Sequence, residues 1–62
     1  MLKITDIKKG TKVKVNGNPA IKDNVYVIDD VVLTERGLWL DLSLESDPHI
    51  HRDEKVTDCE LA

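Results

Sequence analysis

The segment at positions 48–54, Pro-His-Ile-His-Arg-Asp-Glu, has the side chains best suited to metal chemistry. On an extended strand His49 and His51 project to the same side, because successive side chains alternate between faces. A tetrahedral zinc site could be completed by Asp53, Asp58 or Cys59. The neighbouring Arg52 disfavours a bound cation, so we expect no metal site and no cofactor. The two histidines, which are close to several carboxylates, could instead make this part of the protein sensitive to pH.

Catalytic residue types are present, but their spacing predicts no active site. Asp29 and Asp30 are adjacent carboxylates, and neighbours on a strand point to opposite faces, so they cannot share a substrate. Cys59 lies two residues before a leucine near the C-terminus, which is typical of a small core residue. The serines, the cysteine and the histidines form no recognisable set of nucleophile, base and orienting group, and the chain has no glycine-rich phosphate loop. We therefore expect a protein that is not an enzyme.

Trp39 is the residue best suited to recognition. Positions 37–44 read G-L-W-L-D-L-S-L, so the leucines share one face of a strand and Trp39, Asp41 and Ser43 share the other. An outward tryptophan presents a large rigid surface with an indole donor, and Trp and Arg are enriched at interface hot spots. Arg36 lies at the adjoining turn. We predict a protein-binding surface that includes Trp39, Arg36 and Asp41.

The sequence allows two positions for each of the aromatic side chains, Tyr26 and Trp39. Tyr26 joins the predicted binding surface if it shares the outer face with Ile28, but it could also face inward with its hydroxyl at the end of the core. Trp39 could likewise cap the core of the barrel or cover the N-terminal Leu2 and Ile4 instead of meeting a partner.

Charge is distributed unevenly along the chain. Residues 1–22 contain six lysines and one acid, a net charge of +5, whereas residues 23–62 contain eleven acids and three basic residues, a net charge of −8. The simpler interpretation is that these charged residues form a solvated surface that keeps the protein in solution. The sharper one is a basic patch that steers an anionic partner, formed by Lys8, Lys9, Lys12 and Lys14.

Three alternatives to a protein-binding module follow from these charges and from the strand edges. The lysines could bind nucleic acid weakly, although a chain of pI about 5.2 lacks the basic stripe and stacking platform typical of such proteins. The acidic portion could imitate DNA and occupy a DNA-binding protein. The chain could also form a homodimer through an exposed strand edge or through the face of Trp39.

The composition predicts one small all-β domain spanning residues 1–62. Nineteen residues are Val, Ile or Leu, and the many β-branched ones fit a pleated sheet better than a helix. A chain this short has no room for a large internal cavity, so function must lie on the surface. One cysteine forms no internal disulfide, and no apolar run is long enough for a signal peptide or a membrane span. We therefore expect a cytoplasmic protein without membrane contact.

Hydrophobic alternation and turn residues predict the order of elements. They are a short helical lead-in at 4–10, strands at 11–15, 25–35, 37–44 and 49–52, and a turn with a closing strand at 56–61. No strict alternation keeps all the apolar residues of 25–35 inside, which indicates a β-bulge at Asp29-Asp30. A turn at Arg36-Gly37 would pair Leu33 with Leu40 and Thr34 with Trp39. In the same register, Val31 would face Leu42 and Val32 would face Asp41.

This order resembles the SH3-like small barrels, such as photosystem PsaE-type and KOW-type domains. The resemblance rests on the lead-in ending in K-K-G-T-K-V-K-V, the two long hairpin-linked strands, the short strand and the terminal D-C-E-L. The chain lacks the glycine and basic residues of the KOW pattern near its second strand. The resemblance implies a five-stranded barrel or a strongly bent antiparallel sheet, and a binding module rather than an enzyme. We expect a viral or bacterial accessory protein that docks on a larger partner.

Overall fold

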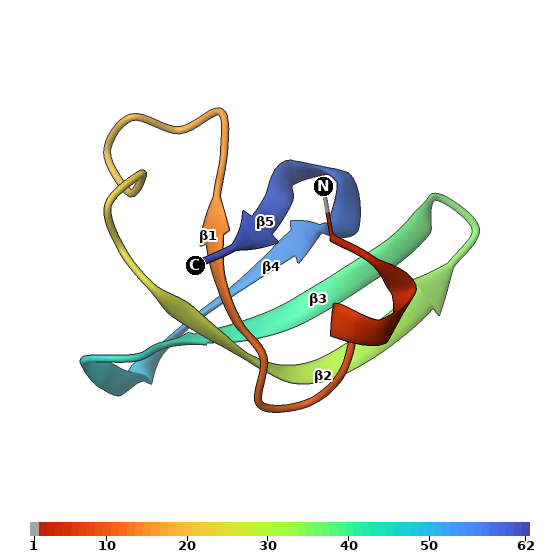
Figure 1. Ribbon diagram of the computed structural model, residues 1–62, viewed down its shortest axis with the longest axis horizontal. Coiled ribbons are helices and arrows are strands. Elements are labelled where there is room, and N and C mark those ends of the chain that lie inside the picture. Colours follow the sequence, from red (N-terminus) through yellow and green to blue (C-terminus); the bar gives the residue numbers. More distant parts are fainter. Residues whose placement is uncertain (1) are drawn as a thin grey trace.

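The computed structural model describes residues 2–62 as one antiparallel sheet of five strands in the order β4-β3-β2-β1-β5 (Figure 1). The strands are β1 (Lys12–Val15), β2 (Tyr26–Thr34), β3 (Gly37–Leu44), β4 (Asp47–Lys55) and β5 (Cys59–Leu61). Two single turns of 3-10 helix, η1 (Ile4–Asp6) and η2 (Val56–Asp58), precede β1 and β5. The predicted all-β fold is confirmed as a bent sheet. It is not a closed barrel, because β4 and β5 are its two free edges within residues 2–62.

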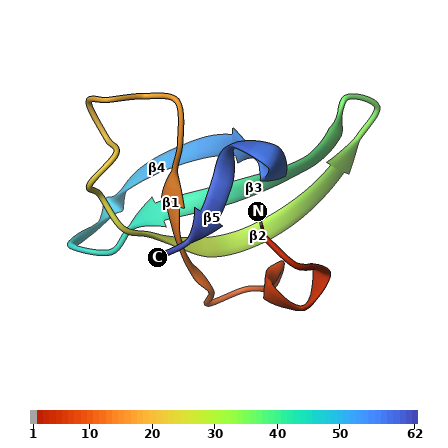
Figure 2. The same cartoon turned by 45° about the horizontal axis from the view of Figure 1, so that its top comes forward.

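The sheet folds over on itself around a single core. Strands β2, β3 and β4 lie alongside one another as a long layer, and β1 and β5 cross this layer (Figures 1 and 2). The turn η2 carries the chain from β4 back to β5 and contacts β3 on the way. This return brings both ends of the sheet onto the same apolar side.

Alternating side chains build the core from this inner face. In β1 the two valines point inward and the two lysines outward, as the period of two requires. In β3, Leu40 and Leu42 are completely buried. The buried apolar residues are Leu2, Val13, Val15, Tyr26, Ile28, Leu40, Leu42, Val56 and Cys59. We call the opposite side of the sheet the outer face.

The bulge predicted at Asp29-Asp30 is confirmed. Ile28 pairs with Leu42, but the next paired residue of β2 is Asp30, which faces Asp41. One extra residue, Asp29, is therefore inserted into β2. Because of it, both Ile28 and Val31 turn toward the core although they are three positions apart.

The predicted turn between β2 and β3 is wrong by one position. Thr34 pairs with Gly37, so Glu35 and Arg36 are the two turn residues. Among residues 2–62, no non-glycine residue has a positive φ, whereas Gly37 has φ +116°. The hairpin thus uses a turn without left-handed central residues, followed by a glycine that is free to adopt this φ. Every predicted pair shifts by two residues, which keeps each side chain on its predicted face.

Two further expectations require correction. The strand predicted at 49–52 extends over the whole of β4, because its charged residues pair with β3 as far as Trp39 opposite Lys55. Leu33, predicted to lie inside opposite Leu40, is 80% exposed and faces Leu38. The end of the β2-β3 hairpin projects beyond the core (Figure 1). Among residues 2–62, no helix has the length and apolar character needed to cross a membrane.

Candidate functional site

Two cross-strand rows on the outer face place chemically different side chains next to each other. The first row is Val32, Trp39 and Lys55, which pair directly across β2, β3 and β4. The second row is Asp30, Asp41 and Asp53, paired in the same way. We call these three residues the aspartate row. Directly paired residues share a face, so both rows lie opposite the core.

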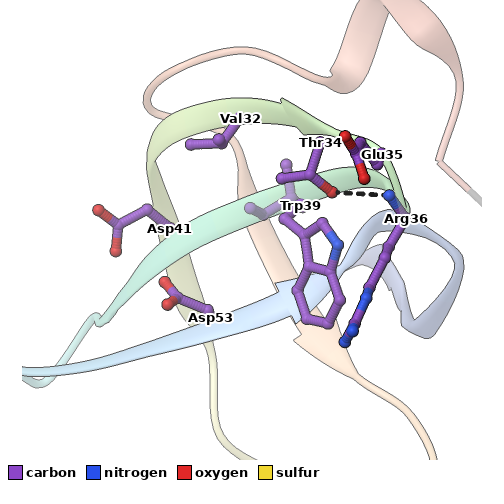
Figure 3. A pocket seen from close by; sticks show the side chains of 8 residues that line it. Val32, Thr34, Glu35, Arg36, Trp39, Asp41 and Asp53 are labelled. Atoms are coloured by element: carbon purple, nitrogen blue, oxygen red, sulfur yellow. Dashed lines mark hydrogen bonds between the residues drawn. The ribbon is translucent and has the colours of Figure 1, made fainter.

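A groove of about 630 Å³ opens on this face. In Figure 3 the indole of Trp39 and the side chain of Arg36 lie at one end, and the carboxylates of Asp41 and Asp53 lie at the other. Trp39 is partly buried and Val32 is 44% exposed, so apolar surface remains accessible in the groove. The lining residues are Val32, Thr34, Glu35, Arg36, Trp39, Leu40, Asp41 and Asp53.

Thr34 fixes the turn that carries Arg36 to the groove. Its Oγ1 donates to the carbonyl oxygen of Gly37 at 3.0 Å. The same Oγ1 accepts from the backbone N–H of Arg36 at 3.1 Å (Figure 3). Two hydrogen bonds from one hydroxyl therefore span the turn. Arg36 itself is exposed and is free to meet a partner.

Trp39 faces outward, as its place in the leucine alternation predicted. It does not cover the N-terminal segment, because Ile4 is 86% exposed and Leu2 is buried in the core on the other side of the sheet. Three of the four residues predicted for the binding surface line the same groove: Trp39, Arg36 and Asp41.

Tyr26 is the exception, and its inclusion in the binding surface is wrong. It is only 2% exposed and belongs to the core, so the inward placement is the observed one. Its hydroxyl accepts a hydrogen bond from Nδ2 of Asn24 at 3.4 Å. The bulge lies downstream of Tyr26, so Tyr26 and Ile28 do share a face, but that face is the inner one.

The aspartate row has no compensating charge of its own. Within residues 2–62, no Lys, Arg or His nitrogen lies within 4.0 Å of a carboxylate of Asp30, Asp41 or Asp53. Asp29, in the bulge, does have a partner, since its Oδ2 lies 3.7 Å from Nδ1 of His51. Like charges directly opposite each other destabilise a sheet. The row therefore opposes folding.

The predicted basic patch does not present four free lysines. Lys12 Nζ lies 2.7 Å from Oε2 of Glu45, and this hydrogen bond and charge raise the pKa of Lys12. Lys14 pairs across the strands with Glu60. Lys8 and Lys9 are exposed in the turn before β1. Glu45 therefore pairs with one lysine of the patch, and a second lysine, Lys14, has an acidic cross-strand neighbour.

The residues considered for metal binding do not come together. No group of three or more His, Cys, Asp or Glu side chains in residues 2–62 has the geometry to hold a metal ion. His51 points to the outer face opposite Ser43, whereas Cys59 is 1% exposed in the core. Burial, with smaller contributions from Glu54 and Asp58, raises the pKa of the Cys59 thiol to about 11. It is therefore a neutral thiol near pH 7.

Comparison with known proteins gives no family for this chain. The sequence matches no protein-family model and no curated protein, and no solved structure matches the fold. The site must therefore be interpreted from its own geometry.

Sequence reasoning missed several residues of the groove, and Asp53 is the most informative of them. The run Asp53-Glu54-Lys55 lacks apolar residues, so the predicted strand ended at Arg52. The alternation along 51–55 nevertheless separates two groups. His51, Asp53 and Lys55 pair with outer-face residues of β3, whereas Arg52 and Glu54 pair with the buried Leu42 and Leu40. Arg52 Nε lies 2.8 Å from Oε2 of Glu54, which satisfies both charges on the inner face.

Proposed function

We propose that this protein is a small protein-binding module that docks on a larger partner through the groove at Trp39. The observation that carries the proposal is the placement of Trp39 in an open groove between an exposed arginine and two aspartates. Trp and Arg are the residue types most enriched among interface hot spots. The mechanism is occupation of the partner's surface, and it requires no covalent chemistry.

The shape of the site supports a macromolecular partner. The groove lies on one face of the β2-β3-β4 layer and is lined by side chains of three neighbouring strands and one turn. Such a shallow site fits an extended segment better than a small molecule, which usually binds in a concave pocket that covers most of its surface. The resemblance to SH3-like barrels, which are generally binding modules, points the same way.

The test is capture of a partner by immobilised protein from nuclease-treated lysate of the source organism or its host. Wild type is compared with Trp39→Ala and with Ile4→Ala, a matched control that removes an exposed apolar side chain outside the groove. Circular dichroism must first show that both variants are folded. We expect a partner that wild type and Ile4→Ala retain and that Trp39→Ala loses by at least about tenfold, since a hot-spot truncation costs about 2 kcal/mol or more.

Reconstitution with the purified partner makes the test decisive. Binding of that protein should quench or shift the fluorescence of Trp39, the only tryptophan in the chain. If Trp39→Ala and Ile4→Ala capture the same proteins in the same amounts, the groove is not the docking site. Recovery of nucleic acid alone from untreated lysate would instead favour the lysines of the N-terminal region.

A further inference from the structure

We infer that the groove binds an extended segment of a partner protein in which a basic, an apolar and an acidic side chain occupy positions i, i+2 and i+4, in either chain direction. This inference rests on the proposed function and names the chemistry of the partner. It comes from the order of charges along the groove and from their spacing.

The acidic end of the groove is lined by Asp41 and Asp53, two members of the aspartate row, and Asp30 lies next to it. Three carboxylates face one another across β2, β3 and β4, and none has a cationic partner within 4.0 Å among residues 2–62. Lack of a cationic partner is common among the carboxylates of residues 2–62, and only Glu45 and Glu54 pair with a Lys or Arg. The aspartate row differs because its three members lie directly opposite one another across the strands. A basic side chain from a partner would supply the missing charge of the row, and that complementarity would fix the position of the segment.

The other end of the groove is lined by Arg36 and Glu35, and Lys55 lies beside it, so two basic side chains face one acidic side chain there. Arg36 is exposed in the turn, and Lys55 pairs with Trp39 on the outer face. The side chain of Lys55 leans toward the turn, since its Cε lies 3.3 Å from the position that a Cβ on Gly37 would take. Neither cation lies within 4.0 Å of a carboxylate in residues 2–62. An acidic side chain of the partner fits this end.

Trp39 and Val32 make the centre of the groove apolar. The indole can pack against an apolar side chain and can also receive the aliphatic stem of a neighbouring Lys or Arg. A cation near the face of a tryptophan gains further attraction from its π-system. The centre therefore fits a leucine-like residue between the two charged ones.

The spacing of these three regions matches an extended chain. Along β3, Gly37, Trp39 and Asp41 follow one another at intervals of two residues, which is about 6.8 Å per interval in an antiparallel strand. A segment lying along β3 in the extended conformation presents its residues i, i+2 and i+4 on one side at the same interval. The three side chains then meet the basic end, the indole and the aspartate row in turn.

The experiment uses three isomeric peptides with blocked ends and follows the fluorescence of Trp39. Lys-Thr-Leu-Thr-Glu and Glu-Thr-Leu-Thr-Lys place both charges on the same side as leucine, in the two possible chain directions. Thr-Lys-Leu-Glu-Thr has the same composition but places both charges on the side opposite leucine. We expect one of the first two peptides to bind at least about fivefold more tightly than the third, as two exposed ion pairs allow. Equal binding of all three peptides, or binding of none, overturns the inference.

A charge-neutral variant tests the aspartate row directly. The double substitution Asp41→Asn with Asp53→Asn should remove the preference for the alternating peptide, whereas Asp23→Asn, an exposed aspartate outside the groove, should keep it. Urea unfolding verifies that both proteins are folded. An unchanged preference in the double variant overturns the inference. So does a fluorescence response to an oligonucleotide, or to a rise in protein concentration, that exceeds the response to the alternating peptides.

Failure of this inference is distinguishable from failure of the proposed function. If Trp39→Ala loses the captured partner while the double asparagine variant retains it fully, the groove is the docking site and only the predicted partner chemistry is wrong. If Trp39→Ala retains the partner, the proposed function is wrong as well.

Discussion

The two ends of the outer face differ in which charges lie opposite each other across the strands. Near β1 and β5, Lys12 lies 2.7 Å from Glu45, and Lys14 has the oppositely charged Glu60 as its cross-strand neighbour. On the β2-β3-β4 layer, the aspartate row places like charges directly opposite each other. The first arrangement favours folding, whereas the second opposes it. Selection for stability alone does not explain like charges placed directly opposite one another. Under the proposed function, the charges near β1 and β5 support the fold and the aspartate row is available to a partner.

The largest expected effect on stability comes from truncating a buried side chain of the core that lies under the outer face. Leu42→Ala should lower the free energy of unfolding by about 2–5 kcal/mol, because it leaves a cavity beneath the aspartate row. Leu33→Ala is the matched control, since Leu33 is 80% exposed and its loss should change stability by less than about 0.5 kcal/mol. Urea denaturation measures both. Equal effects of the two substitutions would contradict the assignment of the core.

Alkaline pH should lower the stability of the folded protein by ionising Cys59, which is buried in the core at the start of β5. The pKa of Cys59 rises from 9.0 to about 11 in the folded protein, so its stabilising contribution is complete below pH 9 and is lost as the pH rises through 11. A shift of two pKa units corresponds to at most about 3 kcal/mol. Urea unfolding of wild type and Cys59→Ala between pH 8 and pH 11 is the measurement. The difference in stability between them should shrink at high pH, and a constant difference would refute this prediction.

Alanine substitutions at two glycines should show whether the fluorescence of Trp39 responds only to changes near the groove. Gly37 and Gly17 have φ +116° and +83°, so an alanine at either position should cost about 1–2 kcal/mol of backbone strain. Only at Gly37 does the added Cβ approach another side chain, at 3.3 Å from Cε of Lys55. We expect both variants to lose stability in urea, but only Gly37→Ala to change the fluorescence of Trp39. A spectral change in Gly17→Ala would show that Trp39 does not report on the groove alone.

The smallest effects should differ in sign and test the contrast most directly. Asp41→Asn removes a repulsion and should raise the free energy of unfolding by about 0.2–1 kcal/mol, whereas Glu60→Gln removes an attraction and should lower it by a similar amount. Raising the salt concentration should shrink both differences, because exposed charges are screened. Thermal denaturation at low and high salt measures them. Destabilisation by Asp41→Asn would show that the aspartate row supports the fold.

The parts of the fold that depend on neighbours in sequence could be predicted. The period of two in positions 37–44 determines which side of β3 is apolar, and Trp39 lies on the other side as expected. The broken alternation around Asp29 reveals the bulge, because an extra residue is the simplest way to keep Ile28 and Val31 on one face.

The parts that depend on distant partners could not be predicted. A strand was predicted at 49–52, but the charged end of β4 beyond Arg52 has no apolar alternation and is a strand because it pairs with β3. Without β4, Asp53 cannot be placed beside Asp41, and the aspartate row stays hidden. The burial of Tyr26 could not be predicted for the same reason, because it follows from the return of β1 and β5 over the sheet. The turn was misplaced because a glycine after two turn residues resembles a glycine within the turn.

The position of Asp53 on β4 has a consequence for behaviour at high concentration. Strand β4 is a free edge within residues 2–62, and free edges invite the growth of fibrils by addition of further strands. The aspartate row runs across the sheet and ends on this edge, so each added copy would meet an uncompensated negative charge. Such a charge protects an edge against polymerisation. The protein should therefore aggregate more readily when Asp53 is neutralised, even though its native state becomes more stable.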